Sequence, residues 1–192
     1  NSLAETIVFG RFADEHAAQY SASIPAQHRS RQVIQAANDD LSSLIKPGDE
    51  MARPLQRALR DNMWENCGVV RHEDKLYVAL DIIATLREAS ENLDVRPSSE
   101  GFQDLALALD LRSSLMSAEA SVLGAIERRE TRGAHNRSDY PDTDPAMRVN
   151  FITKLNADGE LSVSRRTVSS ISENMKQWID DEEIEIDGRL LE

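Results

Sequence analysis

Apolar residues recur every three to four positions through the first two thirds of this chain, and that spacing places them on one face of an α-helix. The pattern predicts four helices, over about residues 2–20, 50–67, 74–93 and 101–129. The apolar face of the last one is expected to run through Leu105, Leu109, Met116, Val122 and Ile126. Asp49 is the expected N-cap of the second helix. Short connections join the last three helices, and such connections favour antiparallel packing.

In the last third of the chain, the spacing of apolar residues changes from three or four positions to two. Residues 148–155 and 160–168 alternate apolar and polar side chains on either side of an Asn-Ala-Asp-Gly sequence, which predicts a β-hairpin. A weak helix is expected over 173–179. The acidic run at 180–183 that follows is interpreted as a solvated tail rather than a binding site.

These patterns together predict a mainly α fold. The expected architecture is an antiparallel three-helix bundle, similar to a spectrin repeat, with an N-terminal helix and a C-terminal β-hairpin and tail. The segment between the first two long helices contains two prolines and a glycine, so it is expected to be a linker with one weak helix over about 29–38. The predicted division of the chain is a terminal helix at 1–20, a linker at 21–48, the helical bundle at 49–140, and the hairpin with its acidic tail at 141–192.

Composition excludes several classes of function. The formal net charge of −12 argues against nucleic-acid binding, because a phosphate-binding domain normally carries a basic stripe. No apolar run approaches the roughly 20 residues that a membrane-spanning helix needs. The single cysteine, Cys67, cannot form an internal disulfide, so a reducing, cytoplasmic compartment is the default expectation. The chain starts at Asn1 without methionine and is helical in pattern from the start, which suggests a piece of a larger protein.

Motifs for nucleotide or metal binding are absent from the sequence. There is no GxGxxG, no Walker loop, no CxxC pair and no HExxH. The four histidines are scattered without the spacing of metal ligands, so no metal site is expected. Cys67 follows a stripe of apolar residues and is interpreted as an inert buried thiol.

One dense polar cluster stands out at residues 128–141, where the longest predicted helix ends. It contains four arginines, a histidine and two acidic residues. Gly133 is a plausible C-cap of that helix, with the cations simply solvated beside the helix dipole. The alternative, which we favour, is a hydrogen-bonded hub, because guanidinium groups seldom cluster without acceptors. We call this set the arginine hub; it consists of Glu130, Arg132, His135, Arg137 and Asp139. A structural role is expected for it, rather than direct catalysis.

The cluster also carries a resemblance. Residues 130–141, Glu-Thr-Arg-Gly-Ala-His-Asn-Arg-Ser-Asp-Tyr-Pro, closely resemble the E-S-R-G-A-H-x-R-x-D-Y-P signature of the succinate dehydrogenase, fumarate reductase and L-aspartate oxidase flavoproteins, with only Thr131 departing. Residues 59–71 and 109–119 are similar to two helical blocks of that family. The opening residues 1–11 resemble the N-S-L-x-E-x-x-V-F-G-R helix that ends its flavin-binding domain. The four blocks occur in the family's order.

The resemblance implies a role for each part of the chain. Residues 1–20 would be the terminal helix of a flavin-binding domain, and Ser2 and Leu3 would present backbone N–H groups to the flavin ring of FAD. The catalytic residues of the family lie upstream, so none is expected in this chain, which should be inactive alone. The full protein would interconvert succinate and fumarate, pass electrons to an iron–sulfur subunit, and sit at the inner face of the cell membrane through partner subunits. The isolated chain could form a homodimer through the exposed face of its first helix.

Two alternatives remain. The signature is shared with L-aspartate oxidase, but that enzyme usually stops soon after it, whereas this chain continues with a strand pair and an Arg-Arg-Thr-Val segment at 165–168 that is similar to the dehydrogenase and reductase subunits. A non-enzymatic helical interaction module would show the same acidic composition and the same lack of catalytic motifs. The direction of the reaction cannot be read from the sequence.

Overall fold

The computed structural model describes residues 2–25, 30–96, 102–156, 158–170 and 172. Helices dominate this part of the chain, which confirms the mainly α prediction. The helices are α1 (Ser2–Ser23), α2 (Arg31–Leu44), α3 (Ala52–Asn66), α4 (Glu73–Ser90), α5 (Gln103–Glu127) and the short 3-10 helix η1 (Pro145–Met147). The strands are β1 (Val70–Arg71), β2 (Asn136–Arg137), β3 (Val149–Leu155) and β4 (Leu161–Thr167).

The chain divides into two compact units, residues 1–43 and 44–192. The first unit consists of α1 and nearly all of α2, and α2 is longer than the weak helix expected over 29–38. Ser30 accounts for its start, because the Ser30 hydroxyl accepts a hydrogen bond from the Val33 backbone N–H at 3.2 Å. No helix-breaking residue then interrupts the chain before Pro47. Apolar side chains of both helices are exposed, including Ile7 at 73% and Ile34 at 50%.

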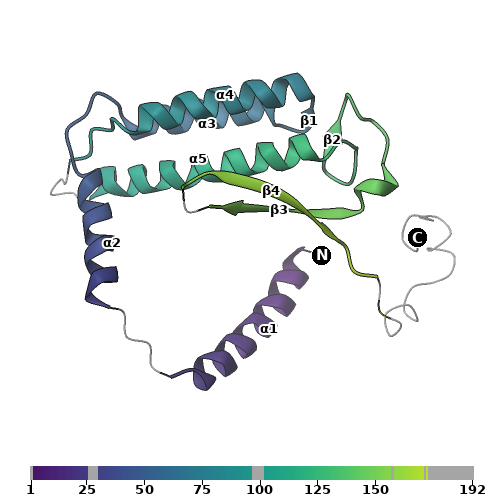
Figure 1. The fold of residues 1–192 in the computed structure, drawn as a ribbon, viewed down its shortest axis with the longest axis horizontal. Coiled ribbons are helices and arrows are strands. Elements are labelled where there is room, and N and C mark those ends of the chain that lie inside the picture. The colour runs from purple at the N-terminus through teal and green to yellow at the C-terminus, as the bar shows by residue number, and fades with distance from the viewer. Residues whose placement is uncertain (1, 26–29, 97–101, 157, 171, 173–192) are drawn as a thin grey trace. The chain divides into compact units, whose positions relative to one another are not determined.

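In the second unit, α3, α4 and α5 each pack against the other two. Figure 1 shows α4 running in the opposite direction to α3 and α5. The buried core comes from the faces on which these helices meet, at spacings of three, four and seven residues. Its helical members are Leu55, Leu59, Leu76, Ala79, Ile83, Leu86, Ala108, Leu111, Leu115, Ala118, Val122, Ala125 and Ile126. Three alanines on α5 allow the neighbouring helices to approach closely.

Several details of the helices differ from expectation. Asp49 does not cap α3: Met51 holds that position without a side-chain hydrogen bond, and the Asp49 carboxylate instead accepts from the Asn92 side chain at 3.1 Å. Helix α4, which was predicted over 74–93, ends at Ser90, three residues before the predicted end. Gly133 is not a C-cap, because α5 already ends at Glu127; it lies in a separate turn with φ of +57°.

The face that α5 turns to the core was also predicted incorrectly in part. Leu105, Leu109 and Met116 were expected there, yet Met116 is 36% exposed and Leu105 and Leu109 are half-buried. Leu111 and Leu115 lie fully in the core instead. Apolar residues surround much of this helix, so more than one face satisfies a 3.6-residue period.

The predicted hairpin forms from β3 and β4, which pair antiparallel with Val149 opposite Thr167, and both strands contact α5. In its turn, the Asn156 side chain accepts hydrogen bonds from the backbone N–H groups of Asp158 and Glu160, and Gly159 adopts φ of +83°. The predicted weak helix at 173–179 and the acidic run lie outside the described residues.

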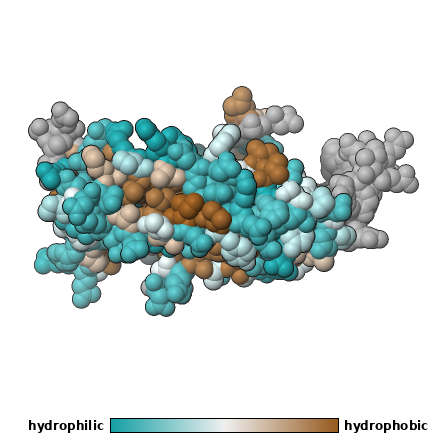
Figure 2. All heavy atoms as spheres, turned by 90° about the horizontal axis from the view of Figure 1, so that it is seen from above, coloured by the Kyte–Doolittle hydropathy of each residue, from teal (hydrophilic) through white to brown (hydrophobic). Residues whose placement is uncertain are grey.

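Some large hydrophobic side chains of the second unit remain exposed, among them Trp64 at 79%, Tyr77 at 50% and Val78 at 47%. Figure 2 shows hydrophobic residues on one face of the molecule, bordered by hydrophilic ones. Over the residues that the structure describes, none of the helices combines the length and apolar character that crossing a membrane requires.

Candidate functional site

The arginine hub lies where three helix ends meet. The segment after α5 forms β2, which pairs in parallel with β1, so that Val70 is opposite Asn136 and Arg71 is opposite Arg137. Strand β1 connects the end of α3 to the start of α4. The pairing therefore brings the polar cluster after α5 next to the C-terminus of α3 and the N-terminus of α4.

Arg137 is the centre of the cluster, and its side chain is fully buried. Its guanidinium group donates two hydrogen bonds to the Asp139 carboxylate, at 2.8 and 2.7 Å, in a bidentate pair. The third nitrogen donates to the backbone carbonyl of Ala125 at 2.8 Å and, at 3.4 Å, to that of Arg128. These carbonyls lie at the C-terminus of α5, where the helix leaves them without backbone partners.

Asp139 completes the link to the neighbouring helix. Its carboxylate accepts the backbone N–H of Glu73, the first residue of α4, at 3.0 Å. The hydrogen bonds from Arg137, together with this backbone N–H, hold the pKa of Asp139 far below its usual range despite partial burial. The pair thus places a cation at the negative end of α5 and an anion at the positive end of α4.

Glu130 forms the second charged centre and is also fully buried. Its carboxylate accepts from both sides of the Arg132 guanidinium, at 2.8 and 3.0 Å, from Arg128 at 2.5 Å, and from the Asp144 backbone N–H at 2.9 Å. Burial alone would raise the pKa of Glu130, but the hydrogen bonds from Arg132, Asp144 and Arg128 outweigh it and the pKa is lowered. All four lone-pair positions of this carboxylate are therefore occupied.

His135 bridges the two centres in its neutral form. Its Nδ1 lies 2.8 Å from the Arg71 guanidinium, which can only donate, so Nδ1 is the acceptor. Its Nε2 then carries the proton and donates to the Arg128 carbonyl at 3.0 Å. Burial lowers the pKa of His135, and the surrounding guanidinium groups of Arg71, Arg137 and Arg128 lower it further, although the hydrogen bond to the carbonyl acts in the opposite direction.

Arg128 connects the hub to the hairpin. Besides Glu130, it donates to the backbone carbonyls of Met147 at 3.1 Å and Val149 at 2.7 Å. Its guanidinium carbon also lies 4.7 Å from the centre of the Phe151 ring on β3, within cation–π range. The position of the hairpin is thus tied to the end of α5.

The structure brings all five predicted hub residues together. It adds three that sequence reasoning left out of the hub: Arg71, Arg128 and Thr131. The Thr131 hydroxyl accepts the Arg137 backbone N–H at 2.9 Å and donates to the Tyr140 carbonyl at 2.9 Å. Arg128 is part of the same arginine-rich stretch, which is a signal that could have included it, whereas Arg71 is 64 residues from His135 and no local pattern connects them.

The other predicted site residues lie in the first unit. Helix α1 begins at Ser2, and the Leu3 side chain is 81% exposed. Backbone N–H groups in the first turn of a helix have no acceptor within the helix, so this end of α1 offers donors to an anionic group.

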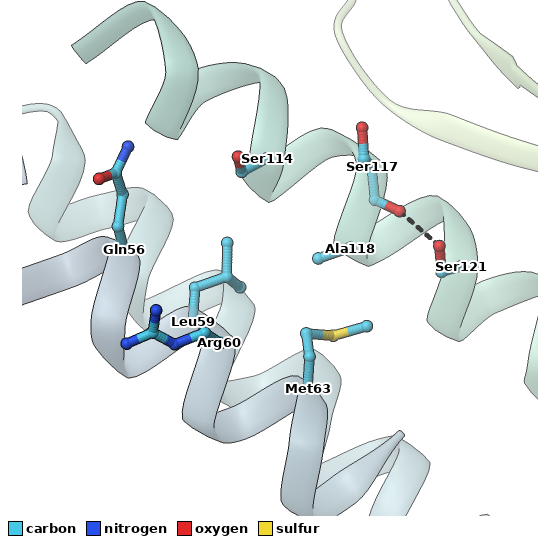
Figure 3. Close-up of a pocket in the computed structure, with 8 residues that line it drawn as sticks. All are labelled: Gln56, Leu59, Arg60, Met63, Ser114, Ser117, Ala118 and Ser121. Atoms are coloured by element: carbon cyan, nitrogen blue, oxygen red, sulfur yellow. Dashed lines mark hydrogen bonds between the residues drawn. The ribbon is translucent and has the colours of Figure 1, made fainter. Parts of the chain in front are cut away.

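The second unit also contains a pocket of about 410 Å³ between α3 and α5. Figure 3 shows Leu59 and Met63 of α3 reaching toward Ala118 of α5, with Arg60 extending away from α5. Three serines of α5 form its other side: Ser114, Ser117 and Ser121. The Ser121 hydroxyl already donates to the Ser117 carbonyl at 2.8 Å. The lining contains no acid or histidine that could transfer a proton, so the pocket is suited to packing rather than to catalysis.

The charged groups of the hub are engaged with one another and with the backbone. Its carboxylates are ionised and fully engaged, and its histidine uses both ring nitrogens, so none of these groups is available to a substrate as base or nucleophile. The described residues contain no group of three His, Cys, Asp or Glu side chains arranged to hold a metal ion.

Comparison with known proteins gives a consistent result. The sequence profile described as "Fumarate reductase flavoprotein C-term" matches residues 56–179. One subunit of the CoM/CoB fumarate reductase of Methanothermobacter marburgensis is 34% identical over 153 residues, covering 79% of this chain and 28% of that protein. The fumarate reductase flavoprotein subunit of Escherichia coli is 32% identical over 156 residues, covering 79% of this chain and 26% of that protein.

Solved structures are similar over nearly the whole chain. The Sdh1 complex of Mycobacterium smegmatis in its apo form contains a chain that superposes with a TM-score of 0.84 at 25% identity, covering 97% of this chain and 33% of that one. A quinol-fumarate reductase with menaquinol molecules gives a TM-score of 0.80 at 28% identity, covering 90% of this chain and 31% of that one. The chain spans about a quarter of the length of these curated relatives, and the match lies in the part that carries the hub.

Proposed function

Because this chain belongs to the fumarate reductase flavoprotein C-terminal family, we propose that it is the C-terminal helical part of an FAD-containing subunit that interconverts succinate and fumarate. The observation that carries the proposal is the match over residues 56–179, which includes α3, α4, α5, the hub and the hairpin. The hub contributes structure to that activity: it fixes the ends of α4 and α5 and the start of β3.

The N-terminus of α1 is compatible with a contact to FAD. Its free backbone donors suit an anionic acceptor, and Leu3 is exposed, so Ser2 and Leu3 could lie against a flavin ring through their N–H groups. FAD, when bound to the full protein, supplies the hydride and electron transfer. The present residues would position it and would not react themselves.

The partners follow from the same proposal. The apolar faces of α1 and α2 would be covered by the flavin-binding domain of the same chain, and an iron–sulfur subunit would accept the electrons. The whole assembly would be peripheral to the inner face of the cell membrane, held there by partner subunits. In isolation, exposed residues such as Phe9 at 67% and Phe12 at 53% on α1 favour a homodimer, which light scattering at increasing concentration would detect.

The test is to express the full-length protein from its gene and measure bound FAD, fumarate reduction with a reduced dye, and hydrogen peroxide formation from L-aspartate. The proposal expects flavin absorbance and fumarate reduction in the full protein, and neither in the 192-residue chain. Peroxide formation from L-aspartate without fumarate reduction would instead assign the chain to an oxidase. A full-length protein that binds no flavin would support the interaction-module alternative.

A further inference from the structure

An unusual charge pattern lies on the outer face of α3. In a chain of net charge −12, this helix carries Arg53, Arg57 and Arg60 at spacings of four and three residues, which place them along one face. All three are exposed, and Trp64, 79% exposed, follows one turn later on the same face. We call these four residues the α3 stripe.

The arginines of the α3 stripe have no carboxylate partner among the described residues. Asp61 is one turn from Arg57, yet no ion pair forms between them in the part of the chain that the structure describes. Hub arginines differ in this respect, because Arg128, Arg132 and Arg137 each bind a carboxylate. Like charges one turn apart repel each other, so an unpaired arginine row lowers stability unless an anion covers it.

The surface beside the stripe is hollowed on both sides. One pocket of about 340 Å³ is lined by residues of α3 only: Arg53, Pro54, Arg57, Ala58 and Asp61. The pocket between α3 and α5 lies on the other side, with Arg60 at its rim and Leu59 and Met63 inside (Figure 3). The first pocket is lined mainly by charged residues, two of them arginines of the stripe, so this part of the surface suits an acidic segment.

The chain itself contains a segment of this chemistry. Residues 173–192 include eight acidic and two basic residues, so they hold half of the net charge of the whole chain. Within them, Glu183-Ile184-Glu185-Ile186-Asp187 alternates acids with isoleucines. An extended peptide of this sequence presents its acids on one side, about 7 Å apart. Arg53 and Arg60 are separated by about 10 Å along α3, so two or three such acids match the row.

The chain between the end of β4 and the acidic segment is long enough to reach the α3 stripe. Thr167 ends β4 opposite Val149, whose carbonyl is bound by Arg128 at the end of α5. The C-terminus of α3 lies at the same end of the bundle, because β1 follows it and pairs with β2. Twelve residues lie between Thr167 and Asp180, and a chain of this length can span about 40 Å. The 15 residues of α3 extend about 22 Å.

We propose that the acidic segment 180–187 of this chain docks on the α3 stripe of the same molecule, with its carboxylates on Arg53, Arg57 and Arg60. Docking of this kind depends on ionic strength, since the charges lie at the surface.

The test uses a fluorescein-labelled synthetic peptide of residues 178–192 and two forms of the 192-residue chain, the intact chain and a neutral-tail variant. The neutral tail carries D180N, D181N, E182Q, E183Q, E185Q and D187N. Fluorescence anisotropy at low salt should show that the neutral-tail variant binds the peptide at least about tenfold more tightly than the intact chain, because the tethered tail competes at a high effective concentration. Raising the salt concentration from about 20 to about 200 mM should weaken the binding.

Two matched triple variants in the neutral-tail background locate the site. Replacing Arg53, Arg57 and Arg60 with glutamine should lower the affinity for the peptide at least about tenfold. The control variant replaces three exposed arginines elsewhere with glutamine: Arg129, Arg165 and Arg166. It should change the affinity for the peptide less than about twofold.

Equal losses from both triple variants would overturn the assignment to α3, and equal peptide binding by intact and neutral-tail chains would overturn docking of the tail. If the difference between these two chains disappears on dilution, the tail docks on a second copy and the intramolecular proposal fails. None of these outcomes depends on flavin or on turnover, so they are distinguishable from failure of the proposed enzymatic function.

Discussion

Replacing Arg137 with alanine isolates the contribution of the hub to stability. The substitution removes both hydrogen bonds to Asp139 and the bond to the Ala125 carbonyl. Asp139 keeps its backbone contact to Glu73 but loses its cation, and its side chain is 15% exposed, so it would remain as a nearly buried anion without a counter-charge. Breaking a buried pair in this way costs about 3–5 kcal/mol of the free energy of unfolding.

A matched control lies earlier in the same segment. Arg129 is 52% exposed on its side chain and forms one ion pair with Glu73 at 3.3 Å. Arg129→Ala removes the same charge from the same segment but should cost at most about 1 kcal/mol, as exposed pairs do. Urea unfolding of the 192-residue chain, followed by circular dichroism, measures both values.

The alanine variant could be too unstable to measure, so a double-mutant cycle with Arg137→Lys and Asp139→Asn accompanies it. Lysine retains the charge but cannot form the bidentate pair and reach the Ala125 carbonyl together. We expect a coupling energy of at least about 1 kcal/mol between the two positions. Equal losses from Arg137→Ala and Arg129→Ala, or a coupling near zero, would refute the account of the hub as a buried junction.

Three further changes probe other contacts. Glutamine at position 135 can keep both hydrogen bonds but does not titrate, so His135→Gln tests the effect of protonation. Because the pKa of His135 is lowered in the folded state, the wild-type chain loses stability as the pH falls below about 6.5. The melting temperature of the variant should therefore change less between about pH 7 and 5. Gly48→Ala should cost about 2 kcal/mol in urea unfolding, since the added Cβ would collide with the backbone of Asn92 and Leu93. Arg128→Ala should raise hydrogen exchange of the β3 amides while that of α4 changes little, because Arg128 binds two carbonyls at the start of β3.

The sequence predicted the elements well where period and turn chemistry agreed. The hairpin is the best example: alternation on either side of Asn156 and Gly159 determined both strands to within a residue. The core face of α5 was harder, because apolar residues occur all round the helix and only contacts with α3 and α4 decide that Leu111 is buried and Met116 is not. The predicted N-cap at Asp49 was wrong for a related reason, because the Asp49 side chain accepts a hydrogen bond from Asn92, 43 residues away.

The hub could be located from sequence but not resolved into roles. Arginine density and the resemblance indicated residues 130–139 as a polar cluster. Nothing in the sequence ranks Arg132 against Arg137, yet the Arg132 side chain is 36% exposed whereas that of Arg137 is fully buried. No periodic pattern exists in this irregular segment, so burial depends on which residue meets the Ala125 carbonyl and the Glu73 amide, and those contacts are visible only in three dimensions.

The last prediction concerns why the junction is ionic. Buried ion pairs can often be replaced by apolar side chains of similar volume without loss, because desolvation offsets their attraction. The pair of Arg137 and Asp139 should not follow that pattern, since it also satisfies the carbonyl of Ala125 and the N–H of Glu73 at two helix ends. An apolar pair at these positions, Arg137→Met with Asp139→Leu, would leave both backbone groups unpaired, at about 1–3 kcal/mol each. We therefore expect the double variant to be less stable than the wild type in urea unfolding. A double variant as stable as the wild type would show that water or a backbone adjustment replaces both caps, and that the hub is ionic for some other reason than closing these helix ends.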